Sequence, residues 1–161
     1  MSYNEFITFL GVLIEYNGDS KNIIIPDGVK RIDYRAFSCN KKIETVIIPD
    51  SVVDIDSCAF GGCANIKLLN IPNGVTKIGK STFECCRELE FITIPDGVKH
   101  IDWHAFAGCK KLKFIEIPES VKLINKAAFH NCDSSMTICA PEGSAAQKCA
   151  LDQNFNYVVK K

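Results

Sequence analysis

The chain has 161 residues with 19 basic and 19 acidic side chains, so its formal net charge is zero. This balance gives no attraction to nucleic acid or to an anionic membrane surface, and we expect neither as a partner. Hydrophobic residues make up 47% of the sequence, which excludes a disordered chain. No run approaches the roughly 20 apolar residues of a transmembrane helix, so we expect no membrane insertion.

The chain opens with an apolar run from Phe6 to Ile14. No basic segment precedes the run and no small-residue cleavage site follows it, so it is not expected to be a signal peptide. The sequence therefore predicts either a cytoplasmic protein, or a secreted or cell-surface protein whose export signal lies outside these residues.

Residues 1–25 are expected to form a hairpin that caps the first edge of the fold. Asn17-Gly18 is a typical two-residue hairpin turn, and it lies between two apolar segments, residues 12–16 and 22–25. The predicted hairpin therefore has these two segments as its strands.

Residues 26–140 contain five repeats of 23 residues. The prolines mark the period, because each follows the last by 23 positions (49 − 26 = 23). They are Pro26, Pro49, Pro72, Pro95, Pro118 and Pro141. A period of this length indicates a solenoid, in which each repeat forms one coil and is stabilised by its neighbours.

Each repeat contains a short apolar run that predicts a strand ending at the proline, such as Leu112, Ile115 and Ile117 before Pro118. Equivalent strands of successive coils are expected to pair as one parallel sheet, with Ile48, Ile71, Ile94 and Ile117 as a buried ladder. Turn residues and a second apolar pair follow the proline. An Asp or Asn then predicts the start of one short helical turn, which carries a phenylalanine inward.

The repeat pattern decays after Pro141. Ser144 and Gln147 replace the apolar residues of the preceding repeats, and Ala145–Asp152 fits a helix. Tyr157–Val159 fits a final strand, so residues 141–161 are expected to form a C-terminal cap. The two caps predict that 1–161 is a single, complete solenoid domain.

The pattern IPxxVxxIxxxAFxxCxxLxxIxIP resembles the BspA-like leucine-rich repeats over residues 23–140. The resemblance implies an α/β solenoid, curved as a right-handed superhelix, with a parallel sheet and one helical turn per repeat. It also implies protein binding or cell adhesion, often on microbial surfaces. Large apolar residues stand where small polar ones are usual in the family, at Leu68, Phe91 and Phe114.

Several repeated columns raise chemical alternatives. Cys63, Cys86, Cys109 and Cys132 share one column, but a ladder of parallel side chains does not converge on a tetrahedral zinc ion, so buried free thiols are expected. The column Asp33, Asp56 and Asp102 lacks the oxygen set that calcium requires. The three histidines complete no metal site. We expect no metal, no cofactor and no enzymatic activity.

The candidate binding surface is the outward side of the main sheet. Because side chains alternate along a strand, Leu68, Phe91 and Phe114 should form an exposed apolar stripe across three coils. The flanking candidates are Asn70, Thr93, Glu116, Lys67, Glu90 and Lys113.

The sequence predicts a non-catalytic module that holds a protein or an extended polymer on a concave sheet face, with self-association as a further use of the stripe. The alternative is a structural spacer with no ligand. In that case, the stripe would serve only pairing between exposed side chains or be covered by curvature. Tyr34 and Trp103, which share another column, are the second candidate surface.

Overall fold

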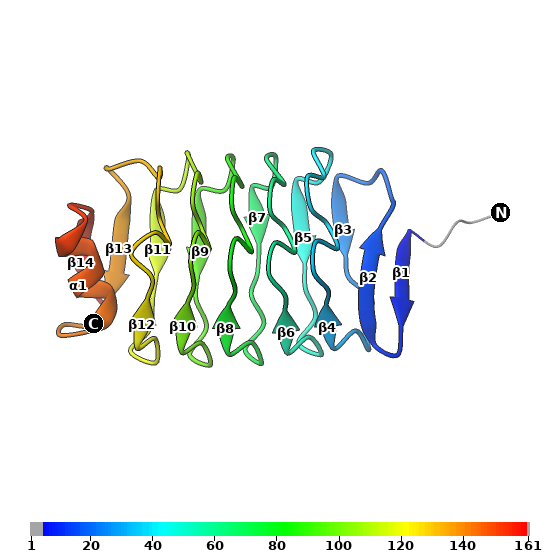
Figure 1. Ribbon diagram of the computed structural model, residues 1–161, viewed down its shortest axis with the longest axis horizontal. Coiled ribbons are helices and arrows are strands. Elements are labelled where there is room, and N and C mark those ends of the chain that lie inside the picture. Colours follow the sequence, from blue (N-terminus) through cyan, green and yellow to red (C-terminus); the bar gives the residue numbers. More distant parts are fainter. Residues whose placement is uncertain (1–4, 161) are drawn as a thin grey trace.

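The computed structural model describes residues 5–160, which form a stack of similar coils with the strand β1 (Phe6–Phe9) and the strand β14 (Asn156–Val159) toward opposite ends of the long axis (Figure 1). Each coil up to the one that carries β12 (Leu123–Ile124) contributes one strand to each of two sheets. The main sheet contains β3 (Asn22–Ile24), β5 (Thr45–Ile47), β7 (Leu68–Leu69), β9 (Phe91–Thr93), β11 (Phe114–Glu116), β13 (Thr137–Ala140) and β14 (Asn156–Val159).

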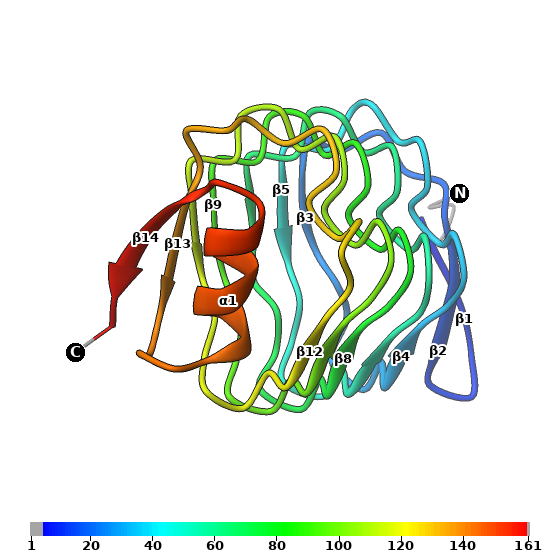
Figure 2. The same cartoon turned by 60° about the vertical axis from the view of Figure 1, so that its left-hand side comes forward.

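The second sheet lies on another side of each coil (Figure 2). It contains β1 (Phe6–Phe9), β2 (Val12–Tyr16), β4 (Arg31–Ile32), β6 (Asp54–Ile55), β8 (Lys77–Ile78), β10 (His100–Ile101) and β12 (Leu123–Ile124). The strands that pair do so in parallel in both sheets, apart from the antiparallel pair β1–β2.

The predicted parallel ladder is confirmed in its direction and burial. Ile48, Ile71, Ile94 and Ile117 are at most 8% exposed. The expectation of one continuous sheet is wrong, because within residues 5–160 no backbone hydrogen bond joins β7 to β9, or β6 to β8. We call these two interruptions the seam. The coil that carries β7 and β8 pairs with the preceding coil in the main sheet and with the following coil in the second sheet.

The core is a ladder of phenylalanine rings. Phe37, Phe60, Phe83, Phe106 and Phe129 stack with centroid separations of 4.8, 5.7, 5.4 and 5.7 Å. Tyr16 packs against the first ring at 5.4 Å, and Phe155 meets the last edge-on at 6.1 Å. The aromatic column therefore extends from the N-terminal hairpin to the segment before β14.

The predicted helical turn is replaced by successive β-turns. The N–H of Ala36 bonds to Asp33 O, and that of Asn40 to Phe37 O, each across three residues. The third residue of each turn, Arg35 and Cys39, has a positive φ of 61° and 60°. Such left-handed residues cannot continue a right-handed helix, so the backbone bends instead.

The N-terminal hairpin prediction is wrong in its turn and its strands. Leu10 and Gly11, with φ of 47° and 78°, form the two-residue turn between β1 and β2. The strands around Asn17-Gly18 do not pair, because β2 joins β4 in the second sheet and β3 joins β5 in the main sheet. Gly18 is buried under the Tyr16 ring at the corner between them.

The C-terminal elements are confirmed. Helix α1 spans Ala145–Asp152, and Ser144 Oγ caps it by accepting from the N–H of Gln147 at 3.1 Å. β14 then extends the main sheet by pairing with β13. Within the described residues no helix is long and apolar enough to cross a membrane. The handedness of any curvature of the stack stays a prediction.

Candidate interaction surface

The outward residues of the main sheet follow from strand alternation. Leu69, Ile92 and Ile115 face the core and are at most 5% exposed. Their neighbours Leu68 and Phe91 point outward and are 62% and 58% exposed. The predicted faces of these strands are therefore confirmed.

Phe114 is only half-buried, unlike the other two members of the predicted stripe. It lies opposite Phe91 on one side and Thr137 on the other, in paired strands. Adjacent side chains on one face of a sheet shield each other, which accounts for its lower exposure. The structure thus brings Phe91 and Phe114 together, with Phe91 as the more prominent group.

Two exposed residues outside the predicted site extend the surface toward the N-terminal end. Ile24 and Ile47 are 67% and 49% exposed and are opposite each other on β3 and β5. The sequence signal was the run of three isoleucines before Pro26, of which alternation leaves the middle one outward. We define the outer apolar patch as Ile24, Ile47, Leu68, Phe91 and Phe114.

The seam crosses this patch and opens a cleft between β7 and β9. The cleft has a volume of ≈ 360 Å³. Its lining residues are Leu68, Leu69, Asn70, Ile71, Asn73, Phe91, Ile92, Thr93 and Pro95. Four of the predicted binding residues, Leu68, Asn70, Phe91 and Thr93, therefore line one depression.

Asn70 accompanies the break in the ladder. Its side-chain Oδ1 accepts from the N–H of Ile48, and its Nδ2 donates to the carbonyl of the same residue, both at 2.8 Å. At the equivalent position of two later coils the N–H donates to a backbone carbonyl, as the N–H of Ile94 does to Glu116 O at 2.9 Å. The amide of Asn70 thus replaces a main-chain contact, and the main chain of β7 ends its pairing with β5 at Leu69.

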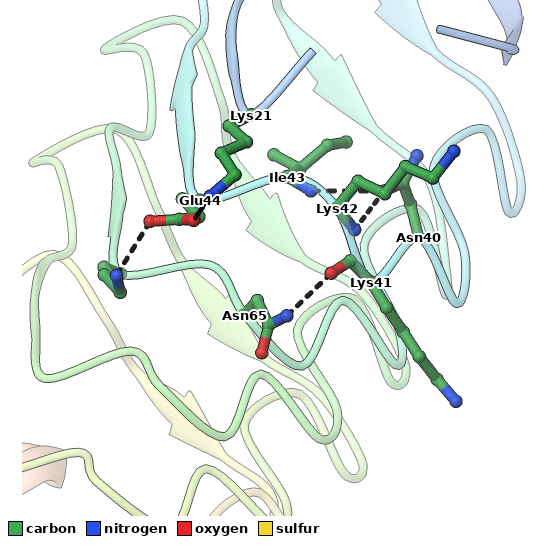
Figure 3. A network of polar contacts seen from close by, with 8 residues as sticks. Lys21, Asn40, Lys41, Lys42, Ile43, Glu44 and Asn65 are labelled. Atoms are coloured by element: carbon green, nitrogen blue, oxygen red, sulfur yellow. Dashed lines mark hydrogen bonds and ion pairs between the residues drawn. The ribbon is translucent and has the colours of Figure 1, made fainter. Parts of the chain in front are cut away.

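The charged residues beside the patch form a ladder of alternating sign. Glu44 lies between Lys21 and Lys67, at 2.9 and 2.7 Å (Figure 3). Glu90 pairs with Lys113 at 2.6 Å. Among the described residues no ion pair joins Lys67 to Glu90, so this ladder breaks at the seam as well.

The ion pairs also shift the pKa of their carboxylates. Hydrogen bonds from Lys67 and then Lys21 lower the pKa of Glu44 to about 2. Lys113 lowers the pKa of Glu90 by the same kind of contact. Glu116 pairs with Lys160 at 2.6 Å, at the far side of the patch. The patch is therefore bordered by charges that are largely compensated.

Polar contacts near the first coils hold the loops beside this border (Figure 3). Asn40 Oδ1 accepts from the N–H groups of Lys42 and Ile43, and Asn65 Nδ2 donates to the carbonyl of Lys41 at 2.7 Å. These contacts hold the turn that leads into β5 in one conformation, and so fix the backbone beside the outer apolar patch.

The cysteine column lies inside the stack. Cys63, Cys86 and Cys109 are fully buried, and Cys132 is half-buried. Each thiol lies close enough to donate to the carbonyl of the phenylalanine 26 residues earlier, at 3.0 to 3.4 Å. Burial raises the pKa of Cys63 to about 12 and that of Cys132 to about 11. The column therefore consists of neutral thiols that cross-link coils by hydrogen bonds.

The second candidate surface is not assembled. Tyr34 and Trp103 are both exposed, but they lie three coils apart in the turn column. Trp103 instead stacks on His104 at 4.0 Å and lies beneath Lys80 Nζ at 4.7 Å. Within residues 5–160 no group of three His, Cys, Asp or Glu residues is placed to hold a metal ion.

A family model for the BspA type leucine rich repeat region matches residues 15–136 in six copies. A leucine rich cell surface protein from Faecalibacterium prausnitzii is 37% identical, with a TM-score of 0.80 over 85% of this chain and 36% of that one. A leucine-rich repeat protein from T. pallidum is 28% identical, with a TM-score of 0.75 over 80% of this chain and 62% of that one. The chain thus spans less than two thirds of either structure. Comparison with curated proteins gives no match.

Proposed function

The chain belongs to the BspA-type leucine-rich repeat family, and we propose that it is a non-catalytic module that binds a protein through the outer apolar patch. The observation that supports this proposal best is the exposure of Leu68 and Phe91 on adjacent coils. Two large apolar side chains about 60% exposed beside one cleft are unusual on a surface without a partner.

The shape of the patch supports a protein or another extended polymer as the ligand. The patch crosses the strands from β3 to β11, so a chain lying along the stack would touch every coil. If the stack curves as the family resemblance implies, this face is the concave one. Burying one such side chain contributes roughly 1.5–3 kcal/mol before the costs of association.

The charges that border the patch are largely compensated, so the affinity for a partner protein should come mainly from apolar contacts. Lys67, Glu90 and Lys113 already have partners or lie at the rim, where ion pairs contribute little. Binding should therefore depend weakly on salt. The Faecalibacterium protein is described as a cell surface protein, which suggests adhesion as the biological role of such a module.

The proposal is tested with the double variant Leu68→Ser/Phe91→Ser. Light scattering over a range of concentrations measures self-association, and affinity capture compares bound proteins between variant and parent. We expect the double variant to lose its specific contacts while its melting temperature stays nearly unchanged, because neither side chain faces the core. The matched control is Val53→Ser/Leu151→Ser, which removes two side chains that are 51% and 63% exposed elsewhere.

The second candidate function, a spacer without a ligand, makes the opposite prediction. It requires that parent and double variant behave alike in both measurements. If the double variant unfolds, the patch is structural and the proposal is wrong.

A further inference from the structure

The second sheet ends at β12 with one side of that strand unpaired. β12 pairs only with β10, through the N–H of Leu123 to Lys99 O and the N–H of Asn125 to Ile101 O. By the same register, the carbonyls of Lys122 and Ile124 point away from β10. Within residues 5–160 no backbone N–H reaches either carbonyl.

The unpaired edge exists because the next coil changes structure. The segment that would form the next strand of the second sheet is the start of α1, capped by Ser144. Ala146 and Ala150 of this helix are fully buried and cover the end of the core. A helix satisfies its own backbone groups, so α1 lies beside β12 without pairing to it (Figure 2).

A cleft of ≈ 590 Å³ lies along this edge and is lined by residues of β12 and of α1, which contact each other. That volume is in the range of ligand-binding sites, about 300–1,000 Å³. The lining residues are Lys122, Leu123, Ile124, Lys126, Ala145, Lys148, Cys149, Asp152 and Gln153. With three lysines and one aspartate, the lining carries a net charge of +2 (3 − 1 = 2).

The lysines are available for a ligand. Lys126 and Lys148 are exposed, and no carboxylate of residues 5–160 lies within ion-pair distance of either. Lys122 pairs with Glu119 at 2.8 Å in an exposed contact. Burial raises the pKa of Cys149 to about 11 and Gln153 donates a hydrogen bond to its sulfur, so this lining residue is a neutral thiol.

We propose that the cleft binds an extended acidic segment of a partner protein, which adds as a strand beside β12. The backbone N–H groups of this segment would donate to the carbonyls of Lys122 and Ile124, as the N–H groups of a further coil would. Strand addition of this kind uses main-chain bonds for affinity and side chains for selection. The selection here is for carboxylates, which would face Lys126 and Lys148, while apolar side chains would contact Leu123. The site is on the other sheet from the outer apolar patch and does not depend on it.

The probe is a fluorescein-labelled hexapeptide of alternating glutamate and valine, followed by fluorescence anisotropy with the full chain. We expect saturable binding, and none by the hexapeptide of alternating lysine and valine. The variant Lys126→Glu/Lys148→Glu should weaken binding at least tenfold. The control Lys41→Glu/Lys110→Glu makes the same change of net charge at exposed lysines outside the cleft and should bind like the parent.

Amide hydrogen exchange distinguishes strand addition from a loose electrostatic contact. The N–H of Ile124 should exchange more slowly when the glutamate peptide is bound. Absence of saturable binding at millimolar peptide, equal affinity of the parent and the cleft variant, or unchanged exchange at Ile124 would each overturn the proposal. So would dimers of the free protein that already protect Ile124, since a second copy would then be the occupant.

Discussion

Replacing Phe83 with alanine tests the aromatic ladder at its centre. The ring is 1% exposed and lies between Phe60 and Phe106, with centroids at 5.7 and 5.4 Å and planes within 16°. Truncating a buried phenylalanine costs about 3–5 kcal/mol, and each lost aromatic pair adds about 0.5–1.5 kcal/mol beyond area burial. We expect the free energy of unfolding to fall by about 4 kcal/mol, the middle of the range for truncation alone, because partial relaxation of the neighbouring rings into the space offsets the loss of the aromatic pairs.

The loss is measured by urea unfolding, followed by circular dichroism and by the fluorescence of the single tryptophan, Trp103. A loss of this size lowers the melting temperature by roughly 8–16 °C for a chain of this length. The matched control is Phe91→Ala, the same change at a side chain that is 58% exposed. We expect it to cost less than about 1 kcal/mol. Equal losses for the two variants would refute the assignment of Phe83 to the core ladder.

Three further predictions concern single groups. At pH 8, a thiol reagent should modify exposed Cys39 first and leave Cys63, Cys86 and Cys109 unmodified until denaturant is added, and labelling of all four at one rate would contradict their burial. The pKa of Glu44, lowered to about 2 from 4.5, means that its ion pairs stabilise the fold above about pH 4.5 and are lost as the pH falls toward 2. A titration of this carboxyl by NMR should show its pKa rising toward 4.5 in Lys67→Gln, whereas no change would show that the pair is absent in solution. Leu10→Asn should raise the free energy of unfolding by about 1 kcal/mol, because Leu10 holds a left-handed φ of 47° and asparagine before glycine suits this turn. A lower melting temperature would indicate that exposed Leu10 makes contacts elsewhere.

The sequence predicted those features that repeat. The isoleucine ladder, the buried cysteines and the outward Leu68 and Phe91 all followed from columns with a common step, since identical residues in successive coils share one environment. The helix over Ala145–Asp152 was predictable because the repeat fails there, where Ser144 and Gln147 replace the apolar residues of the preceding repeats.

The features that the sequence did not predict depend on local backbone conformation. Leu10 gives no sign of a hairpin turn, because leucine rarely adopts a left-handed φ. Asn17-Gly18 has the usual turn residues, but pairing with later coils outweighs the local hairpin. The seam was also unpredictable, because the 23-residue step of the prolines continues through it from Pro49 to Pro72 and Pro95.

The seam gives the stack a preferred site of mechanical failure. When the chain is pulled along its long axis, force passes from coil to coil through the two sheets, the turns and the stacked rings. At the seam each side of one coil keeps the bonds of one sheet and lacks those of the other, so the remaining sheet, the core and the turn bonds, such as Phe60 N–H to Thr82 O at 3.0 Å, carry the load. The weakest interface between repeats opens first in a linear array. The molecule should therefore extend in two steps, as two stiff blocks joined by a softer link, and a ligand that spans the cleft between β7 and β9 would stiffen that link.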